Sequence, residues 1–289
     1  MSWRVVRAVS SKPQGRVWEV RKELSTRLPA GSKGKVLVKR GFFKFTTRAH
    51  RYWGGPAAAN ELIAARLGRL MGLAVAEVVP ARIHGHAGVV SVVRPARRLV
   101  AWRYLPNRVQ GNIAHHVSNA TQFRKMLAFD AWVLNIDRAS GTNIIAYHRR
   151  RGGRWRVYFI DHAHTLHGNY DRWRWGGPYR SRFWDDLWRY YNLPPGAGRY
   201  LRRYAQVARY VRRIRSLSAR QIRQVVRSVP HEMITPAQAA LIERLLLWRQ
   251  ARLPLILKRW FRRRSRSRRS FRSTVHRVWT PRYRRRYRR

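Results

Sequence analysis

Two carboxylates and an amide lie close together in the middle of the chain. Asp137 and Asn143 stand in a polar loop after an apolar, helix-like run, and Asp161 directly follows another apolar segment. Segments 143–147 and 155–160 are both strand-like, and the Gly-Gly pair between them predicts a hairpin turn. Such a hairpin would bring all three polar side chains together at its open end.

These side chains suit one kind of chemistry. Carboxylate and amide oxygens are hard ligands, and Mg²⁺ takes a few of them and completes its shell with water and phosphate. The chain has no Cys, which excludes a catalytic Cys, disulfides and Cys-ligated metals. The residues therefore predict Mg²⁺-nucleotide chemistry.

Lys44 is a second candidate site residue. It interrupts the aromatic strand GFFKF, in a chain where only 8 of the 64 basic residues are Lys. A Lys on the buried side of a strand needs a carboxylate or phosphate partner, and Glu61 in the amphipathic segment 57–73 is the candidate. In the alternative interpretation, Lys44 reaches solvent at a strand edge and Glu61 is an acid favoured near a helix start. Their spacing alone does not decide between the two.

The order of these motifs resembles the HipA-like kinases of the protein-kinase-like superfold, and less closely the lipid kinases. The matching text is NIDR…N followed by YFIDHAHTL, and the likeness is most specific at 123–166. The resemblance implies that Asp137 is the base or orienting carboxylate and that Asn143 and Asp161 are the metal ligands. It also implies that Lys44, held by Glu61, grips the nucleotide phosphates.

The loop departs from the family pattern at one position. The family usually has its Asn five residues after the Asp, but here position 142 is Thr and Asn143 follows. Either the loop is one residue longer or Thr142 fills part of the role.

A Gly-rich turn near the N-terminus is a further candidate for phosphate binding. Gly31, Ser32 and Gly34 would fold their backbone amides around a phosphate. An ordinary hairpin turn explains the same residues.

The resemblance implies an α+β fold with two lobes and the nucleotide, ATP with Mg²⁺, between them. We expect a small β-rich lobe at 1–105 and a larger, mostly helical lobe at 106–257, with 97–105 as the connector near the adenine. The periodicity predicts helices at the following positions: 57–73, 121–134, 200–215, 219–229 and from 236 onward.

The segment 258–289 has a different character. It carries a charge of +16 with no acidic residue and interleaved aromatic side chains. Such a segment repels itself, so we expect a disordered tail that binds nucleic acid or another polyanion.

The whole chain is strongly basic, with 64 basic and 12 acidic residues and a net charge of +52. The sequence predicts no signal peptide and no membrane span, and a cytoplasmic protein follows as the expectation. Two functions from different classes remain. One is an ATP- and Mg²⁺-dependent kinase acting on a hydroxyl, with protein Ser/Thr favoured over a lipid headgroup or a metabolite. The other is an arginine-rich nucleic-acid-binding or packaging protein whose kinase-like body is inactive.

Overall fold

Strands come first along the chain and long helices last. The computed structural model describes residues 2–12, 15–25, 36–45, 56–148, 150, 152–166 and 191–270. The strands are β1 (Arg4–Lys12), β2 (Gly15–Ser25), β3 (Val36–Phe45), β4 (Glu77–Ile83), β5 (His86–Val92), β6 (Arg98–Ala101), β7 (Ile144–His148) and β8 (Arg156–Phe159). The helices are α2 (Ala57–Leu70), η1 (Trp102–Tyr104), α3 (Asn107–Gly111), α4 (Ile113–His116), α5 (Thr121–Val133), α8 (Ala197–Tyr200), α9 (Ala205–Arg215), α10 (Ala219–Arg227) and α11 (Pro236–Ser270).

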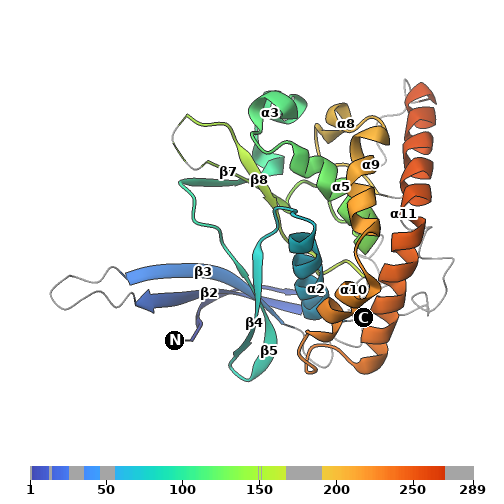
Figure 1. The fold of residues 1–289 in the computed structure, drawn as a ribbon. Coiled ribbons are helices and arrows are strands. Elements are labelled where there is room, and N and C mark those ends of the chain that lie inside the picture. Colours follow the sequence, from blue (N-terminus) through green and yellow to red (C-terminus); the bar gives the residue numbers. More distant parts are fainter. Residues whose placement is uncertain are drawn as a thin grey trace, which may run out of the picture.

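The strands form two sheets. Five of them make an antiparallel sheet in the order β1-β2-β3-β5-β4, and β6-β7-β8 make a small second sheet. In Figure 1 the large sheet lies on one side of the molecule, the long helices lie on the other, and α2 runs between them. The predicted α+β architecture, with a β-rich first part and a helical second part, is confirmed.

The position of Lys44 follows from strand alternation. Phe43 and Phe45 point into an apolar cluster on one face of the sheet. Successive side chains of a strand point to opposite faces, so Lys44 points to the other face. Its cross-strand neighbour there, Val89, belongs to the main core together with residues of α2. The strand therefore delivers the ammonium group toward α2.

Helix α2 is buried on most sides. Eleven of its 14 residues are buried, including the polar Asn60 and Glu61. Its small residues allow close packing: a Cβ added at Gly68 would lie 2.9 Å from a Val75 methyl group. The helix contacts the large sheet and also α10, so its position is fixed from both sides.

The helical part packs around α5. All of the apolar side chains at its C-terminal half are buried, and Trp132 Nε1 donates a 3.0 Å hydrogen bond to Leu246 O of α11. Helices α9 and α11 lie beside α5 in Figure 1 and contact it. Within the residues that the structure describes, no helix is both long enough and apolar enough to cross a membrane.

The expected start of the disordered tail at Lys258 is wrong. Helix α11 continues to Ser270, so the first part of the predicted tail is helical. Trp260 and Phe261 are buried, and Trp260 Nε1 donates to Tyr191 O at 3.1 Å. These apolar side chains bury their surface, while Arg259, Arg262 and Arg263 are exposed on the same helix. Residues 271–289 lie outside the described part of the chain.

We predict that Gly88→Ala destabilises the sheet that carries Lys44. A Cβ at Gly88 would lie 2.4 Å from the Lys44 backbone oxygen and 2.8 Å from two Phe side chains. Overpacking of this kind lowers the free energy of unfolding by about 1–3 kcal/mol, measurable by urea denaturation. Gly153→Ala is the matched control, because its Cβ would meet nothing closer than 3.6 Å. Equal unfolding midpoints for the two variants would contradict the prediction.

Candidate functional site

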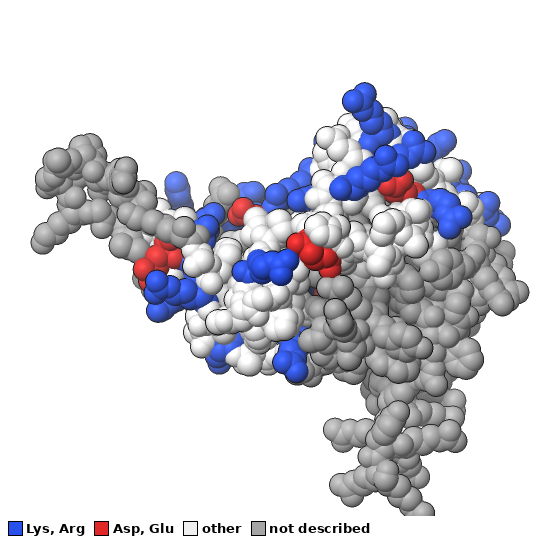
Figure 2. Space-filling model, turned by 90° about the horizontal axis from the view of Figure 1, so that it is seen from below, with Lys and Arg blue, Asp and Glu red and all other residues white. Residues whose placement is uncertain are grey.

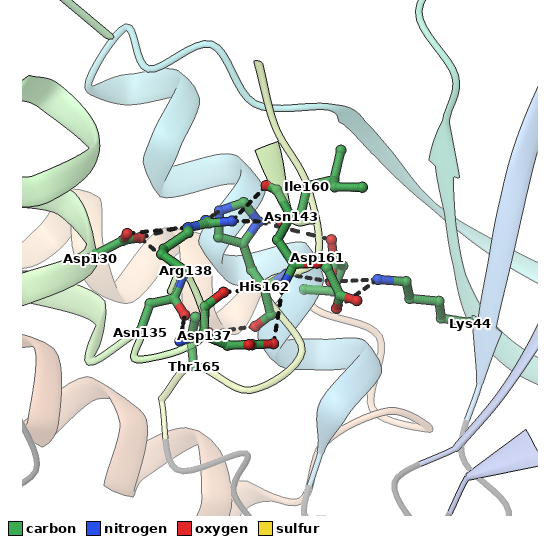
Figure 3. Close-up of polar contacts among 11 residues, drawn as sticks. Lys44, Asp130, Asn135, Asp137, Arg138, Asn143, Ile160, Asp161, His162 and Thr165 are labelled. Carbon is green, nitrogen blue, oxygen red and sulfur yellow. Dashed lines mark hydrogen bonds and ion pairs between the residues drawn. The ribbon is translucent and has the colours of Figure 1, made fainter. Parts of the chain in front are cut away.

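Three charged side chains from distant segments meet beside the large sheet. Lys44 Nζ on β3 lies 2.9 Å from Asp161 Oδ1 and 3.2 Å from Glu61 Oε2 on α2. Figure 3 shows Asp161 directed toward Lys44. Glu61 is fully buried, whereas 37% of the Asp161 side chain is exposed. The cluster therefore opens to solvent on the Asp161 side.

All three groups are charged at neutral pH. Burial raises the pKa of Asp161, but the nearby Lys44 ammonium outweighs it and holds this pKa well below its usual value. Burial also raises the pKa of Glu61, and Lys44 again brings it below the usual value. Burial lowers the pKa of Lys44, but Asp161 and Glu61 hold it above its usual value. One net negative charge is left for a cation.

The loop after α5 presents Asp137. Leu134 takes a left-handed conformation with φ of 58°, which ends the helix. Asn135 then bridges the turn: its Nδ2 donates to Asp130 Oδ1 at 2.9 Å, and its Oδ1 accepts from Asp137 N at 3.0 Å. This side chain fixes the backbone of Asp137 to the end of α5.

Asn143 contacts Asp137 directly. Its Nδ2 donates to Asp137 Oδ2 at 2.9 Å and to Asp137 O at 3.1 Å. The hydroxyl of Thr142 instead lies 2.7 Å from Ser140 Oγ. The longer loop therefore brings Asn143, and not Thr142, to the carboxylate. The amide oxygen of Asn143 is left on the side away from Asp137.

Asp161 is held in an unusual backbone conformation. Its φ of 56° lies in the left-handed region, which Asp tolerates better than most residues. His162 N donates to Glu61 Oε2 at 2.7 Å, and Asn60 Nδ2 donates to Thr165 O at 2.9 Å. Both residues of α2 thus anchor the segment that carries Asp161.

Arg138, which the sequence analysis did not single out, joins these loops. Its fully buried guanidinium donates to Asp130 Oδ2 at 3.1 Å, to Asn143 O at 2.9 Å and to Ile160 O at 2.8 Å. Figure 3 shows it between Asp130 and the segment of Ile160 and His162. It therefore positions both predicted metal ligands through their neighbouring backbone.

The same guanidinium sets the protonation of His162. Its Nη2 lies 2.7 Å from His162 Nε2, and a guanidinium only donates, so Nε2 accepts. The imidazole proton is then on Nδ1, 3.9 Å from Glu61 Oε1. Burial, and next the charge of Arg138, lower the pKa of His162, so the ring is neutral.

An apolar face lies next to the charged cluster. By strand alternation, Ile145 and Tyr147 share one face of β7, with Tyr158 of β8 opposite Ile145. Ile160, directly after β8, belongs to the same apolar cluster. Both Ile side chains are partly exposed, and Ile160 directly precedes Asp161. The remaining members of this cluster are Ala74, Ala76 and Ala96. Sequence reasoning did not identify this face, because its residues come from four separate segments.

The donor set fits the Mg²⁺ ion that the sequence analysis implies. Ile160 N donates to Asn143 O at 3.1 Å, so Asn143 and Asp161 lie at adjacent positions of the hairpin. Among the described residues, no hydrogen bond reaches Asn143 Oδ1 or Asp161 Oδ2. Two such oxygens are a typical protein contribution to Mg²⁺, which keeps water and phosphate ligands. No group of three or more His, Cys, Asp or Glu within the described part forms a metal site.

The structure thus brings together Lys44, Glu61 and Asp161, and separately pairs Asp137 with Asn143 on the adjoining loop. The predicted phosphate-binding residues Gly31, Ser32 and Gly34 lie outside the described residues. The sequence does carry a signal for a buried cation such as Arg138. Asp130 sits in the middle of an apolar helical run, and a buried carboxylate requires a cationic partner.

Comparison with solved structures gives the fold. The proinflammatory kinase CtkA of Helicobacter pylori matches with a TM-score of 0.55 and 13% identity, over 84% of this chain and 96% of CtkA. HipA of Shewanella oneidensis, in its complex with HipB and operator DNA, matches with a TM-score of 0.46 and 16% identity, over 86% and 66%. No family model and no curated protein matches the sequence. The chain therefore has the fold of the kinase CtkA.

We predict that Lys44→Met destabilises the protein in a pH-dependent way. Removing the ammonium leaves Glu61 buried without its partner, and a broken buried pair lowers the free energy of unfolding by about 3 kcal/mol at pH 7. Because the folded-state pKa values of Glu61 and Asp161 are lowered, the stability from this pairing is lost as pH falls through the acidic range. The difference from wild type therefore shrinks between pH 7 and pH 3 in urea denaturation.

Lys39→Met is the control for this prediction. Lys39 is exposed on the same strand, so its replacement changes stability by about 0.5 kcal/mol or less. A difference between Lys44→Met and wild type that stays constant with pH would contradict the assignment.

We predict strong coupling between Arg138 and Asp130. Each single variant, Arg138→Met or Asp130→Asn, leaves a buried charge without its partner and lowers the free energy of unfolding by about 3 kcal/mol or more. In the double variant, the free energy of unfolding should fall by about 1–3 kcal/mol less than the sum of the two single losses. Urea denaturation measures all four proteins. If one single variant does not fold, recovery of cooperative unfolding in the double variant is the readout, and strict additivity would contradict the prediction.

Proposed function

We propose that the protein is an ATP- and Mg²⁺-dependent phosphotransferase that acts on a hydroxyl group. The observation that carries the proposal is the position of Lys44 between Glu61 and Asp161, in a kinase-like fold where the residue before Asp161 is hydrogen-bonded to the Asp137–Asn143 loop. Positioning and charge neutralisation supply most of the catalysis in this class of reaction, and a preorganised buried cluster provides both. The HipA-like resemblance favours a Ser or Thr hydroxyl of a protein as the acceptor.

The charged cluster would bind the phosphates. Glu61 holds the Lys44 ammonium at the mouth of the site, where it can contact phosphate oxygens. Asn143 Oδ1 and Asp161 Oδ2 would hold Mg²⁺, which when bound neutralises charge on the phosphates. The single net negative charge of the three-residue cluster favours this cation.

Asp137 would orient and deprotonate the acceptor. Its Oδ2 accepts from Asn143, and no hydrogen bond reaches its Oδ1 among the described residues. In the transfer, the acceptor oxygen bonds to the γ-phosphorus as the bond to the β–γ bridging oxygen breaks, and ADP leaves. Asp137 Oδ1 takes the proton that the hydroxyl gives up.

The apolar face would take the base. Ile145 and Ile160 offer an apolar surface that begins one residue before Asp161, and Ala96, directly before the predicted connector, belongs to the same cluster. An adenine ring on this surface would have its phosphates on the side of Lys44. Mostly apolar surroundings with a few polar groups are typical of cofactor sites.

We predict that Asp161→Asn removes Mg²⁺-dependent turnover while the fold is kept. The amide has nearly the same shape but lacks the charge that attracts Mg²⁺, so ATP turnover should fall at least about 100-fold. Because Asp161 is more than one-third exposed, thermal unfolding should change little. ATP binding with and without Mg²⁺, measured by calorimetry, and ADP release check the prediction.

Glu77→Gln is the matched control, because Glu77 is exposed on β4 and its replacement removes the same charge. Equal Mg²⁺-dependent binding and turnover in Asp161→Asn and Glu77→Gln would remove the assigned metal ligand. Absence of Mg²⁺-dependent ATP binding in the wild type would favour the alternative, a nucleic-acid-binding protein with an inactive kinase-like body.

A further inference from the structure

One folded surface of the helical part is purely basic. The segment 199–227, which contains α9 and α10, has ten Arg and no acidic residue. All ten side chains are exposed. They are Arg199, Arg202, Arg203, Arg209, Arg212, Arg213, Arg215, Arg220, Arg223 and Arg227. We refer to these residues as the α9–α10 surface.

This surface is poorly neutralised. Among the described residues, Glu243 is the acid that pairs with it, at 3.8 Å from Arg223 and 3.0 Å from Arg227. The side chains of Arg212, Arg215 and Arg220 make no hydrogen bond or ion pair within that part of the chain. Concentrated like charge of this kind repels itself and is stabilised by an anionic partner.

Two further observations point to a ligand-binding surface. Burial, and next the charges of Arg213 and Arg209, lower the pKa of Lys125, which shows that cations are crowded at the edge of α9. An open cavity of about 740 Å³ lies along α10, and every residue that lines it can donate hydrogen bonds. The lining residues are Arg220, Arg223, Gln224, Arg227 and Ser228.

We propose that the α9–α10 surface binds the phosphodiester backbone of nucleic acid. Guanidinium groups form bidentate hydrogen bonds with phosphates, and a series of them on two consecutive helices suits a repeating phosphate polymer. An anionic membrane is a poorer partner, because membrane-binding helices also expose large apolar side chains. Within the described residues, the exposed large apolar side chains all lie outside 199–227.

This proposal does not depend on kinase activity or on the tail. Helix α2 contacts the large sheet and also α10, and Figure 1 shows it between them, so the surface is separated from Lys44 by that helix. Figure 2, which shows the molecule from below, has many more basic than acidic groups on the described surface. General basicity must therefore be separated from a specific surface by experiment.

The test uses the full-length chain and two variants that lose the same charge. The surface variant carries Arg212→Gln, Arg215→Gln and Arg220→Gln. The control carries Arg4→Gln, Arg16→Gln and Arg21→Gln on β1 and β2, which are also exposed and make no ion pair in the described part. Fluorescence anisotropy with a 30-base-pair DNA duplex and a single-stranded RNA gives the affinity between 100 and 400 mM NaCl, and thermal unfolding checks both folds.

At 200 mM NaCl the affinity of the surface variant should be lower than that of wild type by about tenfold or more. On the duplex, the slope of log affinity against log salt should become less steep by about 2–3, since each phosphate contact contributes about 0.9. The control should stay within about twofold of wild type in affinity. Equal losses in the two variants would overturn the proposal and leave only general charge attraction. Tighter binding of poly-glutamate than of either nucleic acid, with the same dependence on the surface arginines, would overturn it in favour of an acidic protein partner.

Discussion

The buried guanidinium of Arg138 is the constraint on which the site depends. A cation without exposure must find partners for its donors, because an unpaired buried charge is strongly destabilising. Its partners come from α5, from the loop that ends at Asn143 and from the end of β8. These segments can satisfy it only in one relative arrangement, so the folding of the core also fixes the distance between the two candidate metal ligands.

Hydrogen bonds from neighbouring elements also explain why Asp161 can hold a strained backbone. A left-handed φ at a non-glycine residue is unfavourable and persists only where the surroundings determine it. Here Glu61 and Asn60 of one buried helix bind the residues that follow Asp161. Because α2 is itself packed between the sheet and α10, the ion pair of Lys44 and Glu61 is formed before any ligand binds. A site of this kind requires little reorganisation when charge develops during a reaction.

Much of this arrangement is readable in the sequence, and the exceptions have physical reasons. The periodicity and turn residues predict α2, α5 and the β7–β8 hairpin. The resemblance to the HipA-like kinases implies that Glu61 holds Lys44, and the structure pairs the two side chains. The burial of Arg138 is not predicted, because hydrophobic periodicity assigns every Arg to the surface. The start of the tail was misplaced because composition hides Trp260 and Phe261, whose burial extends α11.

Charge has two different roles in this molecule. Exposed arginines create a long-range positive field, which raises the local concentration of any polyanion but is screened over about 8–10 Å at physiological salt. Such a field cannot distinguish a nucleotide from a nucleic acid. Discrimination has to come from the buried cluster, where Lys44 is already paired with two carboxylates and one net negative charge remains. A bare phosphate gains little there, whereas a phosphate accompanied by a divalent cation meets complementary charge. In the proposed function, this net negative cluster within a chain of net charge +52 would therefore favour metal-bound nucleotides over other polyanions.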